Sequence, residues 1–198
     1  MVGRVFCLLL GMICLVEMAS VNRQVIRTTA TIGQQSTPAK SQFNKALRFN
    51  VYTFTVIAAD TGRVRDVQVK AYRGKLLLTN FRVRVDGAVT GAEAADLDNN
   101  RFPELYIYST SVGSGSFSRV YGWQFFSEHK ADIVPANWRT ALPQGYMGHD
   151  SLWVERGSLC RRFPMYKPGD ANAEPSGGYQ VMRYKLRSAG AAFLLTAE

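Results

Sequence analysis

The pattern of apolar and polar residues changes at about residue 49. From there to the C-terminus, apolar side chains recur at alternate positions in short runs, which turn-forming residues separate. Val67, Val69 and Ala71, for example, alternate with polar residues. A period of two is typical of β-strands that bury one face. Strands are therefore predicted at 49–57, 65–72, 77–85, 105–108, 120–126, 152–155, 158–163, 179–186 and 192–195.

Little helix is expected between these strands. One or two helical turns at 42–47 and a short helical turn at 135–142 are the only candidates. Many short strands with frequent turns are typical of sandwiches and barrels. The sequence thus predicts an all-β fold, an antiparallel β-sandwich or flattened barrel of about eight strands. A single β domain is expected at 46–198.

The N-terminus has the pattern of an export signal. Arg4 precedes a twelve-residue apolar run at 5–16, which is too short to span a bilayer, and small residues follow at 19–20. A signal peptide is therefore predicted at 1–20, followed by a flexible leader at 21–45. The mature protein would be periplasmic, with no membrane span.

Signal removal would leave Cys160 as the last cysteine of the chain. A single cysteine excludes an intrachain disulfide, so the core must stabilise the fold. Its apolar surroundings favour a buried free thiol. The sequence leaves open whether the protein forms a homodimer.

The chain carries a formal net charge of +9, which favours acidic partners. The segment 63–84 is strongly cationic and contains Asp66 as its one acid. Its cations are Arg63, Arg65, Lys70, Arg73, Lys75, Arg82 and Arg84. No recognition helix, RNP motif or zinc finger accompanies them, so a nucleic-acid partner is not expected.

An acidic loop follows at 96–104. Asp96, Asp98, Asn100 and Glu104 offer oxygen ligands at relative positions 1, 3, 5 and 9, a spacing that can converge on Ca²⁺. Arg101 stands where calcium loops usually have glycine. Asp and Asn also stabilise tight turns without a metal, and the sequence leaves both interpretations open. No other cofactor is expected.

A glycine–serine loop at 113–117 follows the strand 105–108. One interpretation is a flexible hairpin tip. The other is a loop that enters a partner's cleft, with Phe117 as its apolar anchor. His149 and Asp150 suggest a weaker third reading as a hydrolase. The serines lack the G-x-S-x-G pattern, however, so an enzyme is not expected.

Several motifs together resemble one family. The segments DLDNNRFPELYIY, GSGSF, QGYMGHD, LCRRFPMYKPGD and PSGGYQVMRYKL are similar to those of the periplasmic inhibitors of invertebrate-type lysozyme. The similarity extends over about residues 49–195. It implies an antiparallel β-sandwich without enzyme activity, which inserts a loop into the active-site cleft of a lysozyme.

The resemblance also implies which residues bind the lysozyme. The family's Ser-Gly-x-Tyr pattern falls on Ser114, Gly115, Ser116 and Phe117, with Phe117 lacking the tyrosine hydroxyl. Tyr121 and Tyr108 are expected on the rim of this loop. The alternative function is a calcium-supported β-sandwich module that binds a polyanionic glycan or cell-surface ligand through the segment 63–84.

Overall fold

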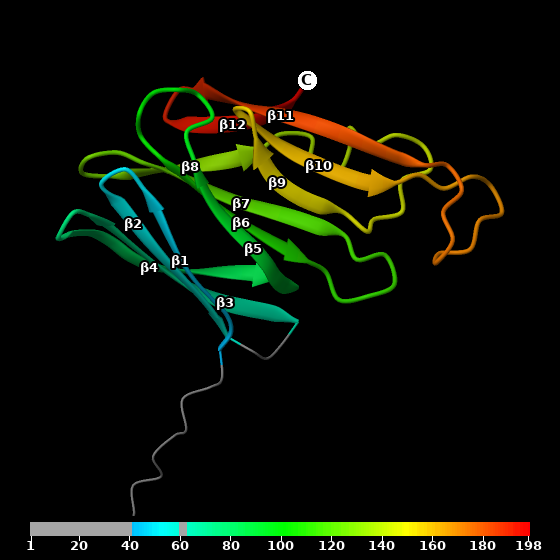
Figure 1. The fold of residues 1–198 in the computed structure, drawn as a ribbon, viewed down its shortest axis with the longest axis horizontal. Helices are drawn as coiled ribbons and strands as arrows, with labels where there is room; N and C mark the ends of the chain where they lie inside the picture. The colour runs from blue at the N-terminus through cyan, green and yellow to red at the C-terminus, as the bar shows by residue number, and fades with distance from the viewer. Residues whose placement is uncertain (1–40, 60–62) are drawn as a thin grey trace, which may run out of the picture. The chain divides into compact units, whose positions relative to one another are not determined.

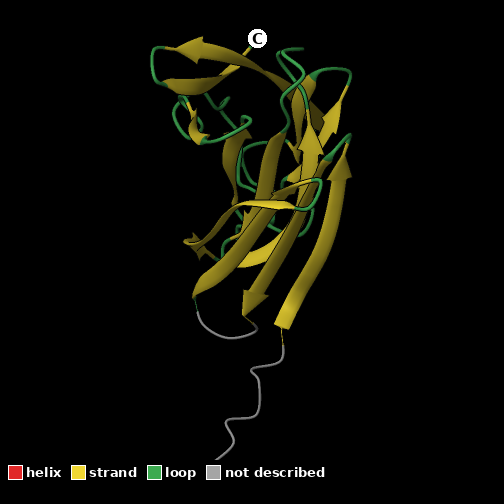
Figure 2. Ribbon diagram, turned by 90° about the vertical axis from the view of Figure 1, so that its left-hand side faces the viewer, coloured by secondary structure: helices red, strands yellow, loops and turns green. Residues whose placement is uncertain are grey.

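The computed structural model describes residues 41–59 and 63–198. The predicted signal peptide at 1–20 and positions 21–40 of the predicted leader lie outside the described residues. Every regular element in the described part is a β-strand, as Figure 2 shows. None of it forms a helix long and apolar enough to cross a membrane.

The strands form two sheets (Figure 1). The first contains four strands in chain order, joined as antiparallel hairpins: β1 (Ser41–Phe49), β2 (Tyr52–Ala59), β3 (Val64–Arg73) and β4 (Leu76–Asp86). The second has the order β5-β6-β7-β8-β12-β11-β10-β9. Its strands are β5 (Ala88–Ala95), β6 (Glu104–Thr110), β7 (Ser118–Phe125), β8 (Lys130–Pro135), β9 (Ser151–Glu155), β10 (Ser158–Pro164), β11 (Tyr179–Ala189) and β12 (Ala192–Ala197).

The second sheet curls until its two edge strands meet at Glu93. The Oε2 atom of this β5 residue accepts a hydrogen bond of 2.8 Å from the backbone N–H of Val154 in β9. The same oxygen accepts a 2.6 Å bond from the Tyr108 hydroxyl of β6. A side chain, rather than a strand ladder, therefore links β5 to β9. All pairings in this sheet are antiparallel except β8 with β12.

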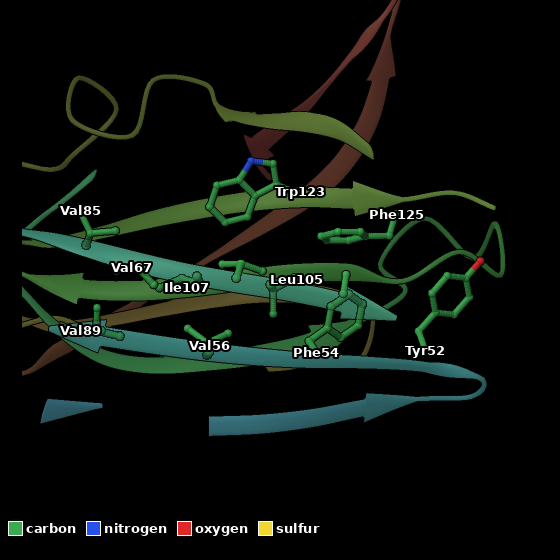
Figure 3. Close-up of a cluster of buried hydrophobic side chains, with 14 residues drawn as sticks. Tyr52, Phe54, Val56, Val67, Val85, Val89, Leu105, Ile107, Trp123 and Phe125 are labelled. Carbon is green, nitrogen blue, oxygen red and sulfur yellow. The ribbon is translucent and has the colours of Figure 1, made fainter. Parts of the chain in front are cut away.

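Two apolar clusters stabilise the sheets. One lies between the first sheet and strands β5–β7, where the Phe54 and Phe125 rings are 4.9 Å apart (Figure 3). The other covers the opposite face of β5–β7 and includes Tyr106, Leu159 and Leu195. Strand β6 contributes to both clusters and is buried at every position except Thr110. This explains why its sequence lacks an apolar–polar alternation.

The predicted all-β class is confirmed, but the strand count and several boundaries differ. The described residues contain twelve strands rather than about eight. Positions 42–47 belong to β1 because their backbone pairs with β2, so the helical turns predicted there are wrong. The domain accordingly begins at least as early as Ser41, within the predicted leader. Strands β5 and β8 were not predicted. In the range 135–142, Pro135 ends β8 and 136–142 forms irregular turns.

Candidate functional site

The connection between β6 and β7 is a short closed loop at 111–117. Its base is fixed by the N–H of Ser111, which donates to the Phe117 carbonyl at 2.9 Å. The N–H of Phe117 donates in turn to the Ser111 hydroxyl at 3.0 Å. Ser116 has a φ of 45°, so a non-glycine residue adopts the left-handed conformation inside the loop. These features define one conformation for a segment of small residues.

Two neighbouring loops brace this segment from outside. The backbone N–H of His149 donates to the Gly115 carbonyl at 2.9 Å. The side-chain amide of Asn172 donates to the Ser114 carbonyl at 2.8 Å. The loop at 111–117 is therefore anchored by its neighbours and does not project freely. The hydroxyls of Ser114 and Ser116 take part in neither of these bonds.

Phe117 lies at the base of the loop, not at its tip. Its ring covers Gly115 so closely that a β-carbon at that position would collide with it. The ring centroid is 5.8 Å from that of Tyr146, and 47% of the residue remains exposed. The exposed tip is formed by positions 112–114, where Val112 is 64% exposed. The prediction that Phe117 forms the tip of the loop is thus wrong, although this residue remains accessible.

A buried ion pair between Arg161 and Asp150 stabilises the base of the loop 111–117. The Nε of Arg161 donates to Oδ1 of Asp150 at 2.8 Å. The second oxygen, Oδ2, accepts from the Ser118 N–H at 2.9 Å and from the Tyr146 hydroxyl at 2.8 Å. Burial disfavours the charge of Arg161, but its hydrogen bond and ion pair with Asp150 prevail and raise its pKa above the usual value.

The same hydrogen bonds involve Asp150, one of the two residues on which a hydrolase would depend. Both carboxylate oxygens of Asp150 accept hydrogen bonds from structural partners. His149 has a φ of 60°, and its Nε2 lies 3.4 Å from Oδ1 of Asn172. His149 and Asp150 therefore do not form a base–carboxylate pair.

A cavity of about 340 Å³ opens beside the loop. Phe117, Trp138, Leu142 and Pro143 supply apolar walls, and the exposed Arg139 supplies a positive charge. The cavity and the exposed face of Phe117 form one continuous feature, since the ring is part of its wall. An apolar group attached to an anionic one would match this lining.

The structure does not place the two predicted rim tyrosines beside the loop. Tyr108 is 4% exposed because it lies on the doubly buried strand β6, and its hydroxyl donates to Glu93. Tyr121 packs against the cluster between the sheets, and its hydroxyl accepts a 3.0 Å bond from the Asp86 N–H. Both predictions for the rim are therefore wrong.

The acidic loop brings three of its four predicted ligands together. Carboxylate oxygens of Asp96, Asp98 and Glu104 lie within 4.8 Å of one another. Asn100 instead stabilises the turn, because its side chain donates to Asp98 and accepts from the Phe102 N–H. Glu104 is fully buried, and this burial raises its pKa to about 9 against the opposing bond from Leu97.

The cations of the segment 63–84 do not all lie on one face of the first sheet. Arg82 and Arg84 are exposed on the outer face of β4, where Asp66 of β3 pairs with Arg84 in the register. Arg65 points to the other face and is only 9% exposed. Lys70 of β3, which pairs with Asn80, shares the outer face with Arg82 and Arg84, whereas Arg65 is lost from it.

Sequence reasoning missed the residues that brace the loop. Arg161 lies in a predicted strand, two positions from both Leu159 and Phe163, and so shares their inward face. A cation at an inward position was the available signal for a buried acid elsewhere in the chain. Asn172 gave no such signal.

Comparison of the sequence with protein-family models and with curated proteins finds no match.

Proposed function

We propose that this protein is an exported periplasmic inhibitor of an invertebrate-type lysozyme and has no enzyme activity of its own. In this proposal the loop 111–117 enters the active-site cleft of the lysozyme. The observation that carries the proposal is the braced loop, which leaves Ser114 and the ring of Phe117 accessible. The resemblance of the Ser114–Phe117 motif to that inhibitor family supports the same function.

The bracing favours tight binding. A flexible loop loses conformational entropy when a partner fixes it, whereas a pre-organised loop has already met this cost during folding. The hydroxyls of Ser114 and Ser116 are not used to hold the loop and are available to hydrogen-bond catalytic groups. The exposed ring of Phe117 supplies the aromatic contact that often dominates such interfaces.

Charge around the loop is also suitable for this target. Glycoside hydrolases generally place two carboxyl groups at the scissile bond, of which one is ionised, so the cleft contains negative charge. Arg139 lies exposed beside Phe117 in the lining of the cavity. A lysozyme can itself be basic, but close contacts of this kind depend on the local charge rather than on the net charge.

An inhibition assay with matched variants tests the proposal. The wild-type protein should inhibit an invertebrate-type lysozyme. A Ser114→Ala/Phe117→Ala variant should inhibit it roughly 30-fold less, as expected for the loss of about 2 kcal/mol at a hot spot. Leu76→Ala is the control. Leu76 is 63% exposed and lies at one end of β4, whereas the loop lies near the other end of that strand. Failure of the wild type to inhibit any such lysozyme would reject the proposal.

The alternative is a module that binds a polyanionic glycan. Arg82 and Arg84, exposed on the outer face of β4, are the observation that favours it. Binding to an acidic polysaccharide should then weaken steeply with salt and should be reduced in an Arg82→Gln/Arg84→Gln variant. The same variant should leave lysozyme inhibition unchanged if the loop 111–117 is the binding site.

A further inference from the structure

Three buried polar oxygens that have no hydrogen-bond partner within residues 41–59 and 63–198 lie on one face of the β6–β7 pair. They are Oε1 of Glu104, the hydroxyl of Tyr106 and Oε1 of Gln124, and all three residues are fully buried. Glu104 and Gln124 are opposite each other in the register, and Tyr106 follows on the same face as Glu104. Buried polar atoms almost always have a partner, so three together call for a bound ion or ordered water.

The unpaired oxygens lie next to the carboxylates of the acidic loop. Oxygens of Asp96, Asp98 and Glu104 converge within 4.8 Å. The side chain of Gln124 contacts Asp98, and Nε2 of Gln124 donates to the Phe102 carbonyl at 3.3 Å. The loop carboxylates and the buried oxygens thus belong to one cluster.

A cluster rich in acceptors is unfavourable in isolation. Mutual repulsion opposes the ionisation of all three carboxyl groups, and the unpaired oxygens of Tyr106 and Gln124 belong to fully buried side chains. A hard divalent cation relieves both effects, because it neutralises the charge and takes oxygen ligands. Ca²⁺ fits better than Mg²⁺. The burial of Glu104 and of the neighbouring Gln124 leaves little room for the water molecules that Mg²⁺ usually retains.

Arg101 does not disrupt this arrangement, although it replaces the usual glycine. Its φ of 71° is the left-handed conformation that glycine provides at the sixth position of calcium loops. Its N–H donates to Oδ2 of Asp96 at 2.9 Å, so the backbone makes the required sharp turn. The Arg101 residue is exposed to solvent.

We infer that the loop 96–104, next to Gln124 of β7, forms a structural calcium site with Asp96, Asp98 and Glu104 as carboxylate ligands. The ion would fix the connection between β5 and β6 against β7. This site lies at the end of β6 opposite the loop 111–117. A negative metal-binding experiment would therefore leave the proposed lysozyme inhibition untouched. A failure to inhibit lysozyme would likewise leave the calcium site untouched.

Calcium titration of the chelator-treated full-length protein tests the inference. About 1 mM Ca²⁺ should raise Tm by about 5 °C or more, and a chelator should reverse the rise. Tb³⁺ should show sensitised luminescence because Tyr106 can transfer excitation to an adjacent ion. Ca²⁺ should quench this signal by competition at concentrations at which Mg²⁺ does not. Absence of both the Tm rise and the luminescence would overturn the inference.

Matched variants assign the site. Glu104→Gln keeps the size of the side chain and should abolish the Ca²⁺-dependent rise in Tm while remaining folded without calcium. Asp98→Asn, at a less buried position, should weaken Ca²⁺ binding by at least tenfold and serves if Glu104→Gln does not fold. Asp132→Asn removes an exposed carboxylate of β8 and should respond to Ca²⁺ as the wild type does. Wild-type Ca²⁺ binding by Glu104→Gln or by Asp98→Asn would overturn the assignment.

Replacement of Arg101 tests the same site by an expected gain, rather than a loss, of Ca²⁺ affinity. Arg101→Gly removes a positive charge and suits the left-handed backbone. Ca²⁺ should then bind roughly threefold to tenfold more tightly, as expected for one charge about 10 Å from a divalent ion in a solvated loop. Weaker binding by Arg101→Gly would contradict the proposed loop geometry.

Discussion

The Nε of Arg161 lies 2.8 Å from Oδ1 of Asp150, and the two side chains are 2% and 0% exposed. Arg161 also donates to the Trp138 carbonyl and to the Tyr146 hydroxyl. Its guanidinium lies 4.5 Å from the centre of the Trp138 ring. Because Asp150 in turn accepts from the first N–H of β7, this pair connects the core of the second sheet to the base of the loop 111–117.

Neutralising Asp150 should therefore strongly destabilise the protein. Asp150→Asn leaves Arg161 buried without its counter-ion, and breaking a buried pair costs about 3–5 kcal/mol. Urea denaturation should show this loss in the free energy of unfolding. Arg156→Gln is the control, because its 3.7 Å pair with Glu155 is exposed and should contribute less than about 0.5 kcal/mol. Equal effects of the two variants would contradict the structural role of the pair.

Gly115 should be needed for the position of the Phe117 ring. A β-carbon at position 115 would collide with that ring, and the ring is the movable end of a side chain. Gly115→Ala should therefore displace the ring with a loss of stability below about 1 kcal/mol. Inhibition of the lysozyme should nevertheless fall to the level of Phe117→Ala. Unchanged inhibition would show that the ring position over Gly115 is not the one that binds.

Asn172 should influence binding more than folding. Its side chain is exposed and donates to the Ser114 carbonyl, so Asn172→Ala removes one of the two external braces. Thermal unfolding should change little, whereas inhibition should weaken roughly fivefold, as expected for about 1 kcal/mol of ordering cost. Glu174→Ala, an exposed change in the same loop, is the control. If the two variants inhibit equally well, the brace has no role in binding.

The all-β fold could be predicted because alternation is a local property. Val67, Val69 and Ala71 are buried as their period of two requires. Strand β5 was missed because its alanines and glycine have low intrinsic β-propensity, and it is held by pairing with β6. Positions 42–47 have no strand pattern of their own and are extended only because β2 lies beside them. Pairing between strands decided these elements.

The candidate site could be predicted only in part for a similar reason. Its central loop carries a local motif, Ser114 to Phe117, that can be read directly from the chain. The bond from Asn172 to Ser114, however, joins residues 58 positions apart. Tyr108 was misplaced on the rim although it ends the unbroken apolar run 105–108, which is typical of a strand buried on both faces. Contacts distant in sequence need the fold before they can be inferred.

Cys160 should be unreactive in the native protein. The residue is fully buried, and this burial raises the pKa of its thiol. A maleimide should leave the peptide that contains Cys160 unmodified under native conditions and label it completely in denaturant, as mass spectrometry would show. Ser114→Cys provides an exposed thiol as the positive control. Native labelling of Cys160, or a disulfide-linked dimer through it, would contradict this burial.

Acid should loosen the loop that carries Asn172. Hydrogen bonds from the N–H groups of Ser176 and Lys167, at 2.8 and 2.7 Å, lower the pKa of the Asp170 carboxyl. Because the pKa is lower in the folded state, the stabilisation is complete above the usual value near 3.8 and is lost as the pH falls through the folded pKa. The Ser176 amide resonance should therefore begin to shift only below about pH 3.8 in an NMR titration.

A neutral residue in place of Asp170 should loosen the same loop at neutral pH as acid does in the wild type. Asp170→Asn should give the Ser176 amide faster hydrogen exchange at pH 7 and should weaken lysozyme inhibition to the same extent as Asn172→Ala. Both effects follow because the loop then no longer holds Asn172 against Ser114. Glu174→Gln removes a nearby exposed carboxylate and should change neither measurement. A Ser176 amide that titrates with a midpoint above pH 3.8 would show that another group controls this loop.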